Sequence, residues 1–83
     1  MFVLTIYFAD WCPDCHAAKH FLNERGIKYN LVNIDENPDA VEIIIAAKGK
    51  RVLPALEYKG RFIDGNKFNK EKFGKDLKEL MAN

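Results

Sequence analysis

Hydrophobic side chains form a nearly unbroken run from Phe2 to Phe8, rich in aromatic and β-branched residues. Such continuous apolarity is typical of a strand buried on both faces, in the middle of a partly parallel sheet. The next segment, from Pro13 to about Arg25, begins with a proline and is followed by Gly26, the residues favoured at the two ends of a helix. We therefore predict a central strand and then a helix. The buried stripe of this helix is predicted to contain Ala17, Ala18, Phe21 and Leu22.

The following pattern predicts a second strand and a second helix. Residues from Tyr29 to Asp35 alternate between apolar and polar, and a strand–helix–strand unit of this spacing almost always forms a right-handed crossover. A helix is expected after Asn37-Pro38, which supplies a cap and a first-turn proline, and Gly49 is expected to end it. The apolar residues of this helix are Val41, Ile43, Ile44 and Ile45.

A hairpin and a last helix complete the predicted order. Ala55 to Tyr58 and Arg61 to Ile63 flank Lys59-Gly60, a two-residue connection that favours an antiparallel hairpin. Beyond this hairpin, Asn69 is expected to cap a helix. The apolar residues at helical spacing in that helix are Phe73, Leu77, Leu80 and Met81. The order βαβαββα, without repeats or linkers, predicts one α/β domain over residues 1–83.

Composition and charge narrow the function. The chain is 48% hydrophobic and 30% charged, which is a globular balance, and its 13 basic and 12 acidic side chains leave a net charge of +1. No overall field would attract nucleic acid or anionic lipid. The apolar opening lacks a basic leader region and is far shorter than a membrane span, so we expect a cytoplasmic protein without a membrane partner.

The two cysteines lie three positions apart, in Cys12-Pro13-Asp14-Cys15, where the first strand leads into the first helix. In a reducing cytosol such a pair is catalytic or binds metal, because ordinary thiols stay reduced there. Cys12 is expected at the helix N-terminus, where backbone N–H groups favour negative charge, so it is the predicted nucleophile. Cys15 lies deeper on the same face and is the predicted resolving thiol.

Two neighbours are expected to tune this pair. Asp14 places a carboxylate near Cys12, and its repulsion disfavours the thiolate and so favours the disulfide. We therefore expect a low reduction potential, which suits a reductant. His16 would offset this effect if its protonated ring pointed toward Cys12.

These residues, with Tyr7-Phe8, Val52-Leu53-Pro54 and Asp64-Gly65, resemble the glutaredoxin-like branch of the thioredoxin superfamily over essentially the whole chain. The resemblance implies a thioredoxin fold, a four-stranded mixed sheet flanked by helices. It also implies a monomeric dithiol oxidoreductase acting on protein disulfides, with Pro54 in the cis form facing the cysteines and Leu53 offering backbone hydrogen bonds to substrate. The substrate-binding residues expected on this basis are Trp11, Pro13, Asp14, Leu53, Pro54, Asp64 and Gly65.

No bound cofactor is expected, and the reducing equivalents would come from glutathione or from thioredoxin reductase and NADPH. Dithiol glutaredoxins carry a basic residue before the first cysteine and a Gly-Gly followed by an acidic residue. Here the corresponding segments are Ala9-Asp10-Trp11 and Ile63-Asp64-Gly65-Asn66, whose acidic groups disfavour the carboxylates of glutathione. The chain resembles the small glutaredoxin-like reductants that accept electrons from thioredoxin reductase about as well as it resembles true glutaredoxins.

Three other functions fit parts of the motif. Cys12 to His16 matches the C-x-x-C-H haem attachment pattern, which the strand leading into it and the lack of an export signal disfavour. The same cysteines with His16 and His20 could hold zinc, although a second segment normally supplies two of the four ligands. A cluster bridging two copies through Cys12 would make the chain a metal-delivery module. His16 and His20 are otherwise expected to be solvated.

Overall fold

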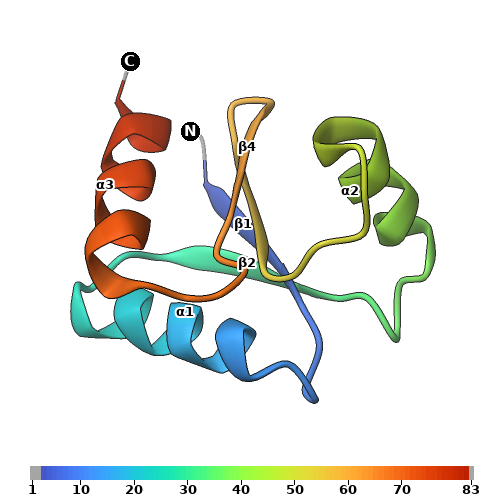
Figure 1. The fold of residues 1–83 in the computed structure, drawn as a ribbon, viewed down its shortest axis with the longest axis horizontal. Helices are drawn as coiled ribbons and strands as arrows, with labels where there is room; N and C mark the ends of the chain where they lie inside the picture. The colour runs from blue at the N-terminus through green and yellow to red at the C-terminus, as the bar shows by residue number, and fades with distance from the viewer. Residues whose placement is uncertain (1–2, 83) are drawn as a thin grey trace.

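The computed structural model describes residues 3–82, in which four strands form one mixed sheet (Figure 1). The elements are β1 (Leu4–Phe8), α1 (Pro13–Glu24), β2 (Tyr29–Asn33), α2 (Asp39–Lys48), β3 (Ala55–Tyr58), β4 (Arg61–Asp64) and α3 (Lys70–Met81). The strand order is β2-β1-β3-β4, with β1 parallel to β2 and antiparallel to β3. This arrangement confirms the predicted βαβαββα order and the central first strand; Phe2, where that strand was predicted to begin, lies outside the described residues.

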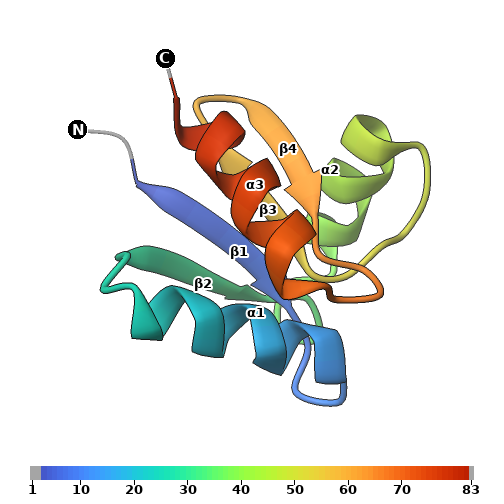
Figure 2. The ribbon, with the colours of Figure 1, turned by 60° about the vertical axis from the view of Figure 1, so that its left-hand side comes forward.

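Two hydrophobic clusters lie on opposite faces of the sheet. Helices α1 and α3 cover one face, where Leu22 and Leu77 pack with Ile6 of β1 (Figure 2). Helix α2 covers the other face, where Ile44 packs with Tyr7. Because alternate residues of β1 point to opposite faces, this strand contributes to both clusters, as its continuous apolarity predicted.

Some element boundaries differ from the predicted ones. The second strand ends at Asn33 rather than Asp35, because the Asn33 side chain accepts the N–H of Asp35 at 2.9 Å and its carbonyl accepts the N–H of Asn37 at 2.9 Å. These local bonds form a turn in place of further ladder bonds. Asn37 does not cap α2, since its side-chain amide donates to the Asn33 carbonyl instead.

The predicted buried faces are largely confirmed. In α1, Ala18, Phe21 and Leu22 are buried, and Cys15 replaces the half-buried Ala17 in the stripe. In α2, Ala40 and Ile44 are buried, whereas the remaining two isoleucines of the predicted apolar face are exposed. Those two are Ile43 and Ile45.

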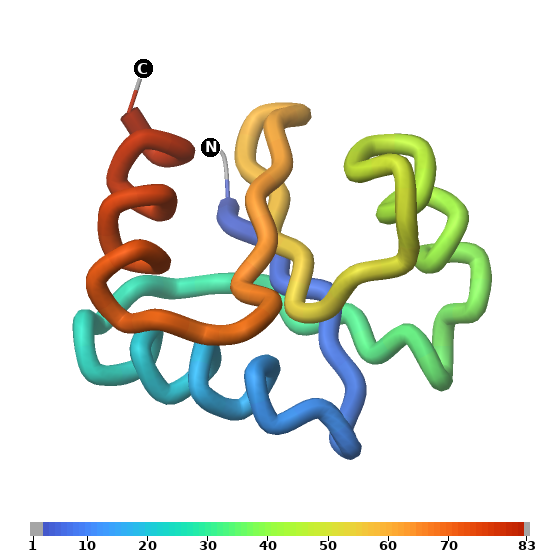
Figure 3. The backbone as a smooth tube through the Cα atoms, in the orientation of Figure 1, coloured from blue at the N-terminus to red at the C-terminus, as the bar shows by residue number. Residues whose placement is uncertain are grey.

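The turns before and after β4 have defined geometry. Lys59 and Gly60 both adopt positive φ, 53° and 80°, which gives the hairpin a turn whose twist matches its strands. Asn69 caps α3 by accepting the N–H of Lys72 at 3.0 Å, as predicted. The backbone between β4 and α3 passes the first turn of α1 (Figure 3). Within residues 3–82, none of the helices has the length and apolarity needed to cross a bilayer.

Candidate active site

Cys12 is the N-cap of α1, at the end of the loop that leaves β1. Its backbone is extended, with φ −98° and ψ 108°, and Pro13 follows in the first helical turn. The Cys12 sulfur accepts the backbone N–H of Cys15 at 3.2 Å. The sulfur therefore lies at the positive end of the helix, in contact with a donor that stabilises negative charge. This is the placement that the sequence predicts for the nucleophile.

Cys15 lies one turn further along α1 and is completely buried. Burial, followed by the hydrogen bond with Cys12, raises the pKa of Cys15 to about 12, and the charge of Asp14 adds a smaller increase. Neither cysteine is in a disulfide in this structure. One sulfur is thus at the surface end of the turn, and the other is a protonated thiol inside the core.

The Leu53-Pro54 peptide bond is cis, as the resemblance implies. The Pro54 carbonyl accepts the N–H of Gly65 at 2.9 Å. A Cβ atom on Gly65 would lie only 2.9 Å from Pro54 Cγ and 3.2 Å from a Phe73 ring carbon, so this position has no room for a side chain. Gly65 is therefore a buried residue that packs against Pro54 and holds it in place.

A cleft of about 260 Å³ opens beside Cys12. It is lined by residues of the loop before α1, the first turn of α1, the α2–β3 loop and the β4–α3 loop. These residues are Trp11, Cys12, Pro13, Asp14, Arg51, Val52, Leu53 and Asn66. Cys12 is only 6% exposed at this cleft, so a disulfide must enter the cleft to reach its sulfur.

Trp11 forms one wall of the cleft and is 60% exposed. Its indole N–H donates to Asp35 at 3.0 Å, and the Arg51 guanidinium lies 5.7 Å from the ring centroid. An exposed aromatic ring held by two partners is suited to contact a protein surface. Neither of these partners could be assigned from the sequence, because they come from different loops.

The Asp14 carboxylate has two bonding partners that the sequence does not predict. One oxygen accepts the N–H of Lys67 at 3.0 Å and the other accepts the N–H of Phe68 at 3.2 Å. Asp14 thus joins α1 to the loop before α3, and its resolved electrostatic effect falls on Cys15. This contact was missed because the bonded residues are more than fifty positions apart.

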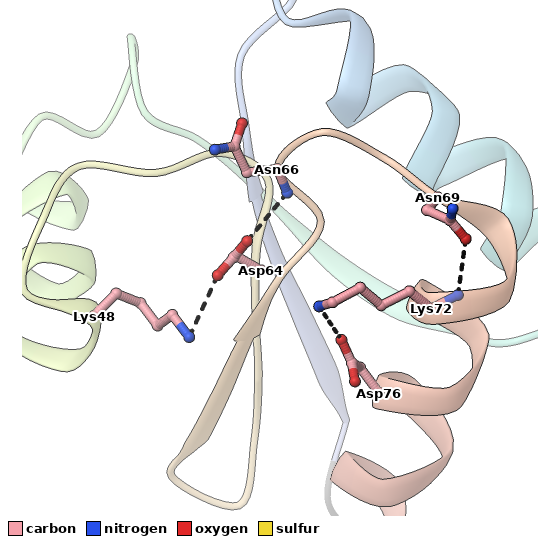
Figure 4. Close-up of polar contacts among 6 residues, drawn as sticks. All are labelled: Lys48, Asp64, Asn66, Asn69, Lys72 and Asp76. Carbon is pink, nitrogen blue, oxygen red and sulfur yellow. Dashed lines mark hydrogen bonds and ion pairs between the residues drawn. The ribbon is translucent and has the colours of Figure 1, made fainter.

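Asp64 is turned away from the cleft, toward α2 (Figure 4). One carboxylate oxygen lies 3.3 Å from Lys48 Nζ, and the other accepts the N–H of Asn66 at 3.2 Å. Among the predicted binding residues, the structure therefore brings Trp11, Pro13, Asp14 and Leu53 to the cleft. The cleft also contains Arg51, Val52 and Asn66, which sequence reasoning did not assign to substrate binding.

The two histidines have partners other than the cysteines. His16 Nε2 donates to the Asp10 carbonyl at 2.7 Å, and His20 lies 3.4 Å from Glu24. His16 therefore holds the loop before Cys12 through its bond to the Asp10 carbonyl. Over residues 3–82, no group of three or more His, Cys, Asp and Glu side chains is arranged to hold a metal ion. The four candidate zinc ligands do not converge.

Known proteins resemble this chain in both sequence and fold. The glutaredoxin family model matches residues 4–63. The glutaredoxin-like protein NrdH of Salmonella typhimurium is 40% identical over 53 residues, which span 64% of this chain and 64% of that protein. The NrdH-redoxin structure from Escherichia coli has 30% identity and a TM-score of 0.72, covering 87% of this chain and 91% of that one.

The glutaredoxin structure from Archaeoglobus fulgidus superimposes on the whole chain, with a TM-score of 0.77, 25% identity and 89% of that chain covered. A TM-score of this size over the full length confirms the predicted thioredoxin fold. The family match extends from β1 through most of β4 and includes both cysteines and the cis proline. The chain belongs to the glutaredoxin family.

Proposed function

We propose that the protein is a dithiol oxidoreductase that reduces protein disulfides, with Cys12 as nucleophile and Cys15 as resolving thiol. One observation carries this proposal: the Cys12 sulfur lies at the cleft, at the N-terminus of α1, and Cys15 is buried one turn further along the helix. Nearness of a second thiol makes resolution of a mixed disulfide intramolecular and therefore fast. The family to which the chain belongs supports the same chemistry.

The cycle transfers two electrons. The Cys12 thiolate attacks one sulfur of the substrate disulfide, forming a mixed disulfide and releasing the other substrate sulfur as a thiolate, which takes up a proton. Cys15 loses its proton and attacks the Cys12 sulfur, releasing the second substrate thiolate. The protein ends with a Cys12–Cys15 disulfide and the substrate with two thiols.

The raised pKa of Cys15 times the second step. Two of its causes depend on Cys12, namely the hydrogen bond to Cys12 and the Cys12 charge, while burial does not. Attachment of a substrate to Cys12 removes the Cys12 charge, so the pKa of Cys15 falls once the mixed disulfide exists. Cys15 is therefore easier to deprotonate after Cys12 has attacked than before, although its burial remains.

Substrate is expected to contact the cleft wall. Trp11, Pro13 and Leu53 line the cleft beside Cys12, and Pro54 follows Leu53 in the cis form. The backbone of Leu53 would pair with an extended peptide next to the attacked sulfur, as main-chain pairing does in other peptide sites. Asp64 and Gly65 would act indirectly, by holding Pro54 and the loop at Asn66.

For the electron donor we propose a thioredoxin reductase rather than glutathione, with NADPH as the source of electrons. The loop before Cys12 presents Asp10 and Trp11 where a basic side chain would favour glutathione. The E. coli NrdH-redoxin is described as a glutaredoxin-like protein with a thioredoxin-like activity profile. A cytoplasmic setting, in which dithiols are kept reduced, suits this cycle.

A coupled assay tests both parts of this proposal. NADPH oxidation is followed with insulin as substrate, once with thioredoxin reductase and once with glutathione plus glutathione reductase. We expect turnover with thioredoxin reductase and little with glutathione. Turnover with glutathione alone would overturn the donor assignment, and absence of reduction even by chemically reduced protein would overturn the oxidoreductase function.

A further inference from the structure

Three successive backbone N–H groups in the loop before α3 all donate to carboxylates of this chain. The N–H of Asn66 donates to Asp64 at 3.2 Å (Figure 4), and those of Lys67 and Phe68 donate to the two oxygens of Asp14 at 3.0 and 3.2 Å. Lys67 adopts the left-handed conformation, with φ 55°. Successive N–H groups that converge at such a turn form a concavity that binds anions. Here the anions are the protein's own side chains.

This occupied turn lies beside the proposed nucleophile. Asp14 and Asn66 line the same cleft as Cys12, and Asp14 follows Cys12 by two residues on α1. A disulfide bound at Cys12 therefore has its flanking groups close to the turn. A carboxylate on such a substrate finds the N–H donors of Lys67 and Phe68 already bonded, and it meets the negative charge of Asp14.

We propose that Asp14 is a specificity-determining residue that fills an anion-accepting turn beside Cys12, and so selects against disulfides carrying a carboxylate near the sulfur. Its preferred substrates are disulfides flanked by neutral or basic groups. The proposal rests on the proposed function, since it concerns the choice of substrate at the same site. It gives a specific role to Asp14, which the sequence predicts to repel the Cys12 thiolate and to contact substrate.

Removal of Asp14 opens the turn to an external anion. In Asp14→Ala the N–H groups of Lys67 and Phe68 lose their acceptors, and the like charge is gone. A charge-assisted hydrogen bond to a carboxylate is then available to the substrate, enough for a roughly tenfold gain. Arg51 lines the same cleft in the wild type and in every variant, so its attraction for anions cancels in the comparison.

The test measures single-turnover oxidation of the reduced protein by two matched disulfides, glutathione disulfide and its tetraethyl ester, which lacks the free carboxylates. Each reaction moves two electrons from the protein dithiol to the disulfide, leaving two thiols. We expect Asp14→Ala to raise the rate ratio of acid to ester roughly tenfold over wild type. The control is Asp39→Ala, which removes an exposed carboxylate from α2 and so changes the net charge by the same amount; it is expected to leave the ratio unchanged.

A ratio that changes no more in Asp14→Ala than in Asp39→Ala would overturn the proposal. If neither disulfide oxidises the reduced wild-type protein, the proposed oxidoreductase function itself is overturned. Should Asp14→Ala fold poorly, Asp14→Asn keeps an acceptor oxygen for the loop but loses the charge, and its ratio must rise in the same direction.

A binding measurement separates a role of Asp14 in specificity from a purely structural role, because a structural role would not let the loop bind a carboxylate. S-methylglutathione, which is not oxidised by the site, is titrated into 15N-labelled protein. In Asp14→Ala the amide signals of Lys67 and Phe68 are expected to shift in a saturable way, whereas in wild type they stay in place. Shifts that are equally large in wild type would contradict the closed turn.

Discussion

The backbone N–H of Cys15 donates to the Cys12 sulfur at 3.2 Å, so one helical turn holds the first cysteine at the cleft and the second inside the core. The two thiols are chemically different although only two residues separate them.

Alkylation of the reduced protein is expected to stop at one site near neutral pH. A pKa raised to about 12 by burial and by Cys12 keeps the Cys15 thiol protonated, so its reactive thiolate forms only as the pH rises toward that value. Mass spectrometry after brief iodoacetamide treatment at increasing pH should show modification of Cys12 first and of Cys15 only in strong alkali.

Two controls accompany this measurement. In denaturant both cysteines should react together at about pH 8, because the burial is lost. In Cys12→Ser the influence of the Cys12 thiolate on Cys15 is gone, so Cys15 should react at a lower pH than in wild type. Equal modification of both cysteines in native wild type at neutral pH would show that burial does not protect Cys15.

Trp11→Ala is expected to weaken the binding of protein substrates more than that of small disulfides. The ring is 60% exposed and forms a cleft wall, and exposed aromatic anchors often dominate contact with a partner. We expect KM for insulin to rise roughly tenfold while kcat changes little, and turnover of 2-hydroxyethyl disulfide to stay within about twofold. Asp35→Ala, which frees the indole N–H, should act in the same direction but less strongly. A similar loss with both substrates would instead indicate damage to the cysteine turn.

Asp14→Asn is expected to raise the reduction potential of the dithiol. The Asp14 carboxylate is a negative charge in the first turn of α1, beside the sulfur that must carry a thiolate in the reaction, and its removal makes the reduced form more stable. The rise should be modest, about 10 to 30 mV, since 30 mV corresponds to ~1.4 kcal/mol for two electrons. Equilibration with a dithiothreitol redox buffer measures it, with Asp39→Asn as the matched control; a fall in potential would refute the electrostatic role.

Gly65→Ala is expected to destabilise the fold and the cleft together. The added methyl would lie 2.9 Å from Pro54 Cγ and 3.2 Å from Phe73, so one of them must move. Overpacking of this kind costs about 1 to 3 kcal/mol. Urea unfolding monitored by circular dichroism should show a lower midpoint with an unchanged slope. An unchanged midpoint would mean that the β4–α3 loop adapts freely.

Much of the fold follows from local pattern. The continuous apolar run of β1, the proline and glycine at the ends of α1, the Lys59-Gly60 turn and the Asn69 cap are each encoded within a few residues, and each is found in the structure. The end of β2 was harder to predict, because the Asn33 side chain can either continue a strand or accept a following backbone N–H, as it does from Asp35. A competition between two short-range bonds is not visible in hydrophobic pattern.

The site divides in the same way. The asymmetry of Cys12 and Cys15 could be predicted, because a strand leading into a helix places them by itself. The partners of Asp14, Trp11 and Asp64 could not, since each bond joins segments that only the finished fold brings together. The local sequence pattern therefore predicts the reactive sulfur atoms, whereas the side chains that would determine substrate specificity are brought together only by the tertiary structure.

Trapping of the mixed disulfide distinguishes the roles of the two cysteines most directly. Reduced Cys15→Ser and Cys12→Ser variants are mixed at neutral pH with a disulfide-containing peptide and analysed by intact mass spectrometry. Cys15→Ser should accumulate a stable adduct through Cys12, because the resolving thiol is missing, while Cys12→Ser should remain unmodified, because Cys15 is buried and protonated. An adduct on Cys15, or equal adducts on both variants, would contradict the assignment of Cys12 as the attacking thiol.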